Sequence, residues 1–170
     1  MRRATVSGPV APGEIVTIFG SGLSGAVTFD GTAATVSYQS PTQIDVTVPY
    51  TVAGQTTTLQ IGSAVLTSLD VVPSAPGIFA AVADGDGALT LYATGCGALT
   101  KDTLPRCQLP VSATVNGQPA QVLYAGIAPG LVSGANQINL LLPSGTTSGP
   151  ISIVVTVGTA SSKAFSFTLP

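Results

Sequence analysis

Apolar residues alternate with polar ones over short stretches of the chain, and turn-forming residues separate these stretches. The run Ile15–Phe19 precedes a glycine-rich segment, and Ala34–Tyr38 follows the pair Asp30-Gly31. Alternation with a period of two is typical of a strand that buries one face, and Asp-Gly favours the tight turn of a β-hairpin. No window shows a sustained apolar period of 3.6 residues. The pattern therefore predicts an all-β protein with no long helix.

The second half of the chain repeats the plan of the first. An Asn-Gly pair at 116–117 follows a strand pattern as Asp30-Gly31 does, and Tyr124 takes the position that Tyr38 has in the first half. Two copies of one supersecondary plan predict two similar domains rather than one large sheet.

Each copy, with about seven short strands, fits an immunoglobulin-like β-sandwich. We expect the first sandwich to span residues 1–77 and the second residues 78–170, with a short, stiff connection at the proline-containing segment 73–77. In both, the alternating apolar residues should face the space between two sheets. The predicted cores are Ile15, Ile18, Val27, Phe29, Val36, Tyr38, Ile44, Val46 and Val48 in the first sandwich, and Leu89, Leu91, Val115, Val122, Tyr124, Ile138, Leu140, Val155 and Phe167 in the second.

Composition narrows the functions that such a chain could have. Its 170 residues include no histidine and no tryptophan, and only seven acidic and five basic residues. Without histidine, the Ser-His-Asp and Cys-His nucleophiles and the histidine-based zinc sites are absent. Five scattered basic residues argue against a nucleic-acid partner, and the longest strongly apolar stretch, Ile78–Ala83, is too short for a membrane span.

The cysteines and the N-terminus bear on the compartment. Cys96 and Cys107 share a loop-like stretch, and an even cysteine count in a Thr- and Gly-rich, lysine-poor chain favours a disulfide formed in an oxidising compartment. The alternative is a pair of unpaired, partly buried thiols. The start MRRATVSGPV has no apolar segment behind its arginines and is not an intact signal peptide. We therefore expect part of a larger exported protein, secreted or at the cell surface.

An acidic segment, Asp84-Gly85-Asp86-Gly87, places two carboxylates on a flexible backbone. Ca²⁺ prefers such oxygen ligands, but four residues supply too few of them, and backbone carbonyls would have to complete a site. A solvated acidic turn is the simpler interpretation. We expect no cofactor and no metal, with Ca²⁺ at Asp84 and Asp86 as the alternative.

Two aromatic residues are candidates for ligand or junction contacts. Most aromatic residues lie on strand patterns, where burial in a core explains them. Tyr50 and Phe79 instead lie next to turns and near the predicted connection between the two domains. Because carbohydrate binding by β-sandwiches usually relies on exposed aromatic rings, these two residues are also the candidates for contact with a glycan.

Several phrases of the sequence resemble a known module. They are VAPGEIVTIFGSGL, VTFDG, YQSPTQIDVTVPY, SAPGIFA, LTLYATGCGAL, VNGQPAQVLYAGIAPGLV and NQINLLLP. Together they are similar to the uncharacterised C-terminal module of secreted acidobacterial proteins, which in turn looks like tandem IPT/TIG immunoglobulin-like domains. The resemblance covers nearly the whole chain and implies the fold, but no activity. The chain departs from that module in its cysteine pair and in a shorter connection before Leu89, which should restrict relative motion of the sandwiches.

The function that we expect is a non-catalytic extracellular interaction, adhesion or structural module. Paired carboxylates are the only hydrolytic chemistry that the composition allows, and no local spacing pairs two of them. A surface with few charges favours a protein partner or self-association through strand edges, because little charge must be desolvated. One alternative is a carbohydrate- or polymer-binding accessory domain of a secreted enzyme. The other is a self-assembling extracellular fibre subunit.

Overall fold

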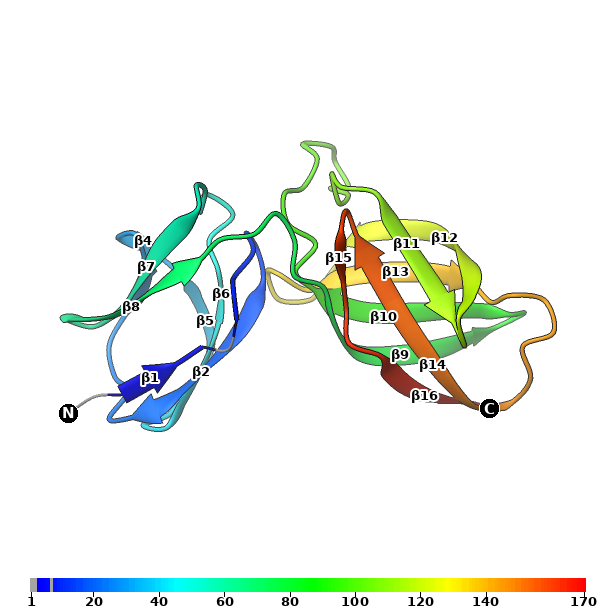
Figure 1. The fold of residues 1–170 in the computed structure, drawn as a ribbon, viewed down its shortest axis with the longest axis horizontal. Coiled ribbons are helices and arrows are strands. Elements are labelled where there is room, and N and C mark those ends of the chain that lie inside the picture. Colours follow the sequence, from blue (N-terminus) through cyan, green and yellow to red (C-terminus); the bar gives the residue numbers. More distant parts are fainter. Residues whose placement is uncertain (1–2, 7) are drawn as a thin grey trace.

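The computed structural model describes residues 3–6 and 8–170. All the regular elements in this part of the chain are β-strands. The strands form two units that lie side by side along the long axis of the molecule, with the first described strand, Arg3–Thr5, and the C-terminus near opposite ends (Figure 1). The prediction of an all-β, immunoglobulin-like fold is confirmed. Among the described residues, no helix is long and apolar enough to cross a membrane.

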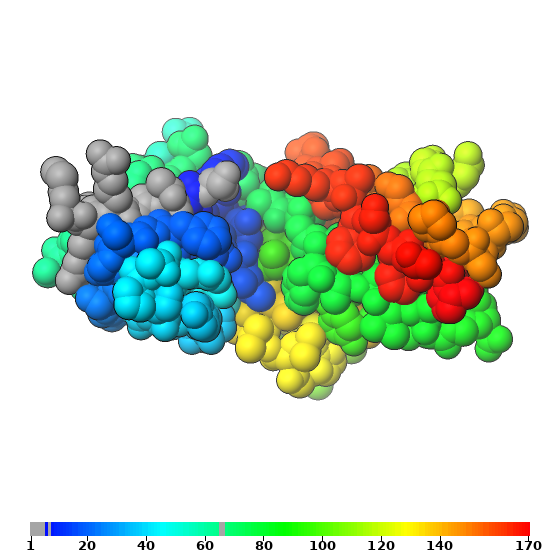
Figure 2. Space-filling view, turned by 90° about the horizontal axis from the view of Figure 1, so that it is seen from below, coloured from blue at the N-terminus to red at the C-terminus, as the bar shows by residue number. Residues whose placement is uncertain are grey.

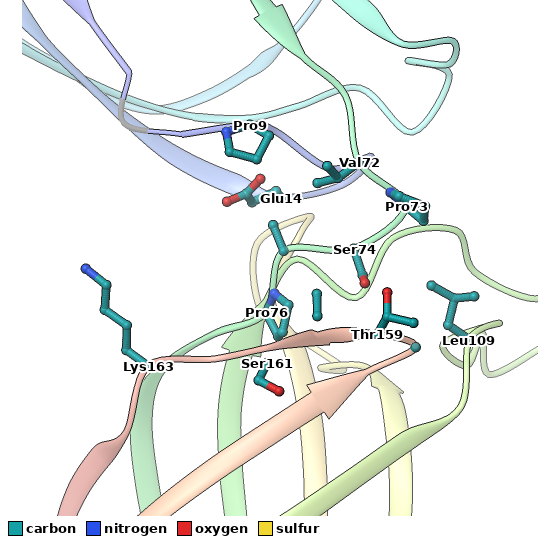
Figure 3. A pocket seen from close by; sticks show the side chains of 13 residues that line it. Pro9, Glu14, Val72, Pro73, Ser74, Pro76, Leu109, Thr159, Ser161 and Lys163 are labelled. Atoms are coloured by element: carbon teal, nitrogen blue, oxygen red, sulfur yellow. The ribbon is translucent and has the colours of Figure 1, made fainter.

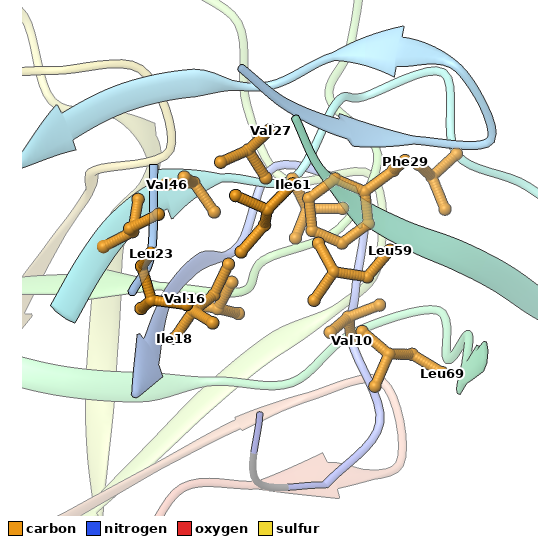
Figure 4. Packing of buried hydrophobic residues seen from close by; sticks show 13 residues of the cluster. Val10, Val16, Ile18, Leu23, Val27, Phe29, Val46, Leu59, Ile61 and Leu69 are labelled. Atoms are coloured by element: carbon orange, nitrogen blue, oxygen red, sulfur yellow. The ribbon is translucent and has the colours of Figure 1, made fainter. Parts of the chain in front are cut away.

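The first unit is a sandwich of two four-stranded antiparallel sheets. One sheet has the order β1 (Arg3–Thr5), β2 (Ile15–Ser21), β6 (Gln43–Thr47) and β5 (Thr35–Gln39). The other has the order β4 (Thr32–Ala33), β3 (Val27–Phe29), β7 (Thr56–Ile61) and β8 (Ala64–Asp70). Phe29 lies fully buried between them, packed with aliphatic side chains from both sheets (Figure 4). Burial of these apolar faces is the main source of stability for such a sandwich.

In the second unit the strands join into one sheet that folds over on itself. Its order is β15 (Ala160–Ser161), β14 (Gly149–Val157), β11 (Val111–Val115), β12 (Gln118–Ile127), β13 (Asn136–Leu141), β10 (Ala88–Thr94) and β9 (Gly77–Gly85), with β16 (Phe165–Leu169) also paired to β14. The start of β12 pairs with β11 and the remainder with β13, so this strand connects the two layers. In the first unit the corresponding strand is divided into β4 and β5.

Equivalent hairpin turns occur in both units. Asp30 and Asn116 each have a positive φ, of 48° and 49°, and each precedes a glycine that also has a positive φ. The Asp30 carboxylate accepts a hydrogen bond from the Thr58 N–H at 2.8 Å, and the side-chain Oδ1 of Asn116 accepts one from the Ser152 N–H at 2.9 Å. The hairpins predicted from Asp-Gly and Asn-Gly are confirmed, because this geometry suits a type I′ turn.

Most of the residues predicted for the two cores are buried. The fully or nearly fully buried members are Ile18, Val27, Phe29, Ile44, Val46, Val48, Leu89, Leu91, Val115, Ile138, Leu140 and Val155. Ile15, Val122, Tyr124 and Phe167 are only half-buried. Ile15 lies at the contact with the second unit, since an added Cβ on Gly134 would lie 2.9 Å from its side chain.

Val36 and Tyr38 were predicted to be in the core, and this is wrong. They are 38% and 51% exposed, and every residue of β5 is exposed. Val36 lies opposite the buried Val46 on the edge strand of the described sheet, where the facing sheet leaves it partly uncovered, whereas a register shift after Val36 places Tyr38 opposite Asp45 on the outer face. Phe19 is 56% exposed on the same outer face, because Val16 and Ile18 face inward and alternation along β2 directs Phe19 outward.

Candidate functional site

The connection between the two units lies directly on the segment 95–97. The Ala75 N–H donates a hydrogen bond to the Gly95 carbonyl at 2.8 Å. Added Cβ atoms at Gly95 and Gly97 would overlap the carbonyl oxygens of Ala75 and Pro73, so the two backbones are in contact. The buried Ser74 hydroxyl donates to the carbonyl of Val157 at 2.8 Å. The connection is therefore seated on the second unit rather than extended through solvent.

The predicted disulfide between Cys96 and Cys107 is formed, with 5.7 Å between the two Cα atoms. Cys96 is buried, and its N–H donates to the side-chain oxygen of Asn136 at 3.3 Å. The Cys107 N–H donates to the Ala125 carbonyl of β12 at 3.1 Å. The disulfide thus ties the segment under the connection to the strand that joins the two layers.

Removing the disulfide should destabilise the protein by about 2–3 kcal/mol, the chain-entropy value for closing a loop of this length. The double variant Cys96→Ser/Cys107→Ser leaves no free thiol, and chemical denaturation followed by circular dichroism measures its loss of stability. Wild-type protein with reductant should behave like the variant. Equal stability of the oxidised wild type and the variant would contradict this role.

Direct hydrogen bonds also join the two units. The Thr94 hydroxyl accepts a hydrogen bond from the Ile15 N–H of the first unit at 2.7 Å and, within the second unit, donates one to the Gly134 carbonyl at 2.9 Å. The Thr47 hydroxyl donates to the Ser133 carbonyl at 2.6 Å. Figure 2 shows yellow atoms of the loop before β13 beside blue atoms of the first unit. These bonds hold the end of β10 and this loop against β2 and β6.

Tyr50 lies in this contact. Its ring is packed on Gly13, where a Cβ would overlap it, and it lines a small cavity with the loop that contains Gly134. Burial raises the pKa of the Tyr50 hydroxyl, and a hydrogen bond with the backbone of Gly134 acts in the opposite direction. The structure therefore places Tyr50 between the units. Phe79, the other aromatic candidate, is 52% exposed on β9 and does not line that cavity.

The acidic segment forms the turn between β9 and β10. Asp86 and Gly87 have positive φ values of 49° and 75°, as in the other two hairpins. The Asp84 carboxylate accepts a hydrogen bond from the Thr90 hydroxyl at 2.5 Å. In the described part of the chain, His, Cys, Asp and Glu residues form no group of three or more that could hold a metal ion. The turn geometry alone accounts for the glycines, and calcium binding stays a hypothesis.

A pocket of about 770 Å³ lies between the units, and we call it the junction pocket (Figure 3). Its walls are mainly apolar. They are formed by Pro9 and Glu14 of the first unit, residues 72–76 of the connection, and Leu109, residues 158–161 and Lys163 of the second unit. Both units and the connection contribute to it, so its shape depends on their relative orientation.

Glu14 is the unusual group in this pocket. The Ala11 N–H donates a hydrogen bond to the Oε2 of Glu14 at 2.8 Å. Among the described contacts, this is the one hydrogen bond that the carboxylate accepts. Burial raises the pKa of Glu14 from 4.5 to about 7, and the hydrogen bond from Ala11 opposes the shift. Lys163 extends from the opposite side of the pocket (Figure 3). Sequence reasoning missed both residues, since each is an isolated charge in its own stretch of chain.

The protein is therefore of the immunoglobulin-like class, with two units that share a pocket. Residues 4–70 match the model of the IPT/TIG domain family. The predicted resemblance to IPT/TIG domains is thereby confirmed for the first unit. In the comparison with curated proteins, no sequence matches the chain.

Solved structures give weaker similarities. Two structures of the full extracellular region of plexin A4 are each 14% identical to the chain, with TM-scores of 0.35 and 0.36. The matches cover 100% and 99% of this chain but only 16% and 18% of the plexin chains. At TM-scores this low, the similarity to the plexin structures does not indicate a function for this protein.

Proposed function

We propose that the chain is a non-catalytic extracellular interaction module, in which two immunoglobulin-like domains, residues 1–77 and 78–170, keep one fixed relative orientation. The observation that carries the proposal is the hydrogen bond across the junction from the Ile15 N–H to the Thr94 hydroxyl, which is itself held by its bond to the Gly134 carbonyl within the second unit. IPT/TIG domains such as residues 4–70 are generally non-catalytic modules.

A fixed orientation favours binding because the partner does not have to order the two domains on association. Freezing a flexible tether would cost conformational entropy and weaken the complex. Here the connection is already seated on Gly95 and Gly97. The low charge of the chain also favours binding, because few ionised groups need to lose water when a partner covers the surface. The disulfide supports an extracellular setting, in which such bonds persist.

An adhesion assay tests the proposal. Beads coated with the chain should attach to surface preparations of the producing cells, and protease treatment of the cell surface should abolish attachment. Loss after glycosidase treatment would favour a carbohydrate ligand instead. Clumping of coated beads in the absence of cells would favour self-assembly. Beads that neither attach nor clump would contradict an interaction function.

Substituting Thr94→Val should weaken the fixed orientation. The change removes both hydrogen bonds and leaves the Ile15 N–H without its partner, a cost of about 1–2 kcal/mol. Small-angle X-ray scattering should show a broader distribution of interdomain distances. Thr146→Val is a matched control, because its hydroxyl donates only within the second unit, to Pro143 at 2.7 Å. Identical scattering of Thr94→Val and wild type would show that other contacts fix the orientation.

Carbohydrate binding is the second candidate, and the outer face of β2, β6 and β5 favours it. Phe19 lies opposite Gln43 and Tyr38 opposite Asp45, so two exposed rings lie on the same face as these polar side chains. The Gln43 amide donates to the Asp45 carboxylate at 3.0 Å. If glycans bind there, Tyr38→Ala should abolish binding on a glycan array, while Tyr92→Ala in the second unit should not. Absence of any glycan signal for the wild type would remove this candidate.

A further inference from the structure

We propose that the junction pocket binds an extended segment of a partner polypeptide, with a basic side chain of that segment paired to Glu14. The inference rests on the proposed function as an interaction module and names the kind of partner. Three features of the pocket carry it: its charges, an unpaired strand edge and rigid apolar walls.

The pocket contains an acidic and a basic side chain, so a peptide that carries charged side chains suits it better than an uncharged hydrocarbon ligand does. Glu14 is half-buried on one side, and Lys163 extends from the other (Figure 3). Among the described side chains, none forms an ion pair with this carboxylate, which has lost much of its water and holds one backbone hydrogen bond. An arginine or lysine side chain of a ligand would supply a compensating cation. Lys163 would in turn favour an acidic group farther along the same ligand.

A strand edge borders the pocket. Within the described residues, β15 is the terminal strand of its sheet and pairs only with β14. Residues 158–161, which include both residues of β15, line the pocket, and Figure 3 shows this segment facing the first unit. An extended peptide can add to such an edge through main-chain hydrogen bonds. Because β15 has only two residues, few such bonds can form, and the side-chain pairs must supply the specificity.

The remaining walls are apolar and stiff. Pro9, Pro73 and Pro76 have fixed φ angles, and Val72 and Leu109 complete the lining. A volume of about 770 Å³ is within the range of ligand-binding pockets and can hold several residues of an extended chain. Because the connection is seated on the second unit, the pocket exists before a ligand arrives, which lowers the entropic cost of binding.

A peptide library provides the test. The probes are fluorescent heptapeptides of Ala, Val and Ser that contain one arginine and one aspartate at varied spacing, with matched peptides in which citrulline replaces arginine. Fluorescence polarisation at pH 8 should find members that bind the wild-type protein, and citrulline should weaken them about tenfold or more. Glu14→Gln should cause the same loss. Asp102→Asn, which removes one negative charge outside the pocket, should leave binding unchanged.

Two results would overturn the inference. One is that no arginine peptide binds with a Kd below about 1 mM; the other is that Glu14→Gln leaves the binding unchanged. Beads coated with Glu14→Gln separate this failure from failure of the proposed function. If the wild-type and variant beads adhere equally, the module binds its partner elsewhere and only the pocket assignment is wrong. If wild-type beads bind no cell surface, the proposed function itself fails.

Discussion

Gly95→Ala is expected to destabilise the protein by about 3 kcal/mol, the combined cost of backbone strain and overpacking. Gly95 has a φ of +76°, a conformation that side chains with a Cβ rarely adopt. The new Cβ would also overlap the Ala75 carbonyl and approach the Pro76 nitrogen, which are backbone atoms that cannot rotate away. The connection would have to move off the second unit and lose the hydrogen bond from Ala75. Urea denaturation of the variant and the wild type measures the loss.

Gly117→Ala is the matched control for this experiment. Gly117 has nearly the same φ, +77°, but an added Cβ there would meet nothing within 4 Å. It should therefore cost only the strain, about 1 kcal/mol. The difference between the two variants isolates the contact between the connection and Gly95. Equal losses for both would show that the connection does not depend on close approach to Gly95.

Gly95→Ala should also change the relative orientation of the two units. Gly95 directly follows Thr94 in the chain and contacts the connection at Ala75, so a shift at Gly95 disturbs both. Scattering from the variant should resemble that from Thr94→Val, with a larger effect. The same variant should lose affinity for any ligand of the junction pocket, because residues 72–76 form one of its walls.

Local features of the fold could be predicted because neighbouring residues determine them. Asp30-Gly31 and Asn116-Gly117 favour positive φ within the pair, and alternation along β2 places Ile18 inside whatever the rest of the chain does. The position of β5 at a sheet edge is not local. That position and the register shift between Val36 and Tyr38 depend on which strands pair, and the shift turns Tyr38 to the outer face although simple alternation predicts it in the core.

The candidate site likewise combines features that the local sequence predicts with features that depend on the three-dimensional arrangement. The disulfide was predictable, because Cys96 and Cys107 are the only cysteines and lie close together in the sequence. Glu14 and Lys163 approach the same pocket only because two separately folded units make contact in one orientation. No periodicity or motif encodes that contact. The short connection indicated restricted motion, but the polar bonds of Thr94 and Thr47 follow from the three-dimensional arrangement alone.

Stability is expected to fall as the pH rises from 5 to 8, because of Glu14. Its pKa is about 7 in the folded protein and 4.5 as its ordinary value, so the folded state holds a proton that the unfolded state releases. The stabilisation from this proton is complete below about pH 4.5 and is lost as the pH rises through 7. The loss at pH 8 reaches at most about 3 kcal/mol. Urea denaturation at pH 5, 6.5 and 8 measures it.

Glu14→Gln should remove most of this dependence, because the amide is neutral throughout and keeps the size of the side chain. At pH 8 the variant should therefore be more stable than the wild type. The pKa of Asp30 is lowered by the hydrogen bond from the Thr58 backbone, so Asp30 titrates below the range. A wild-type slope retained in Glu14→Gln would place the responsible carboxyl elsewhere. A flat profile for the wild type would mean that water reaches Glu14 freely, and the pocket would then lack the desolvated carboxylate on which its preference for a basic side chain depends.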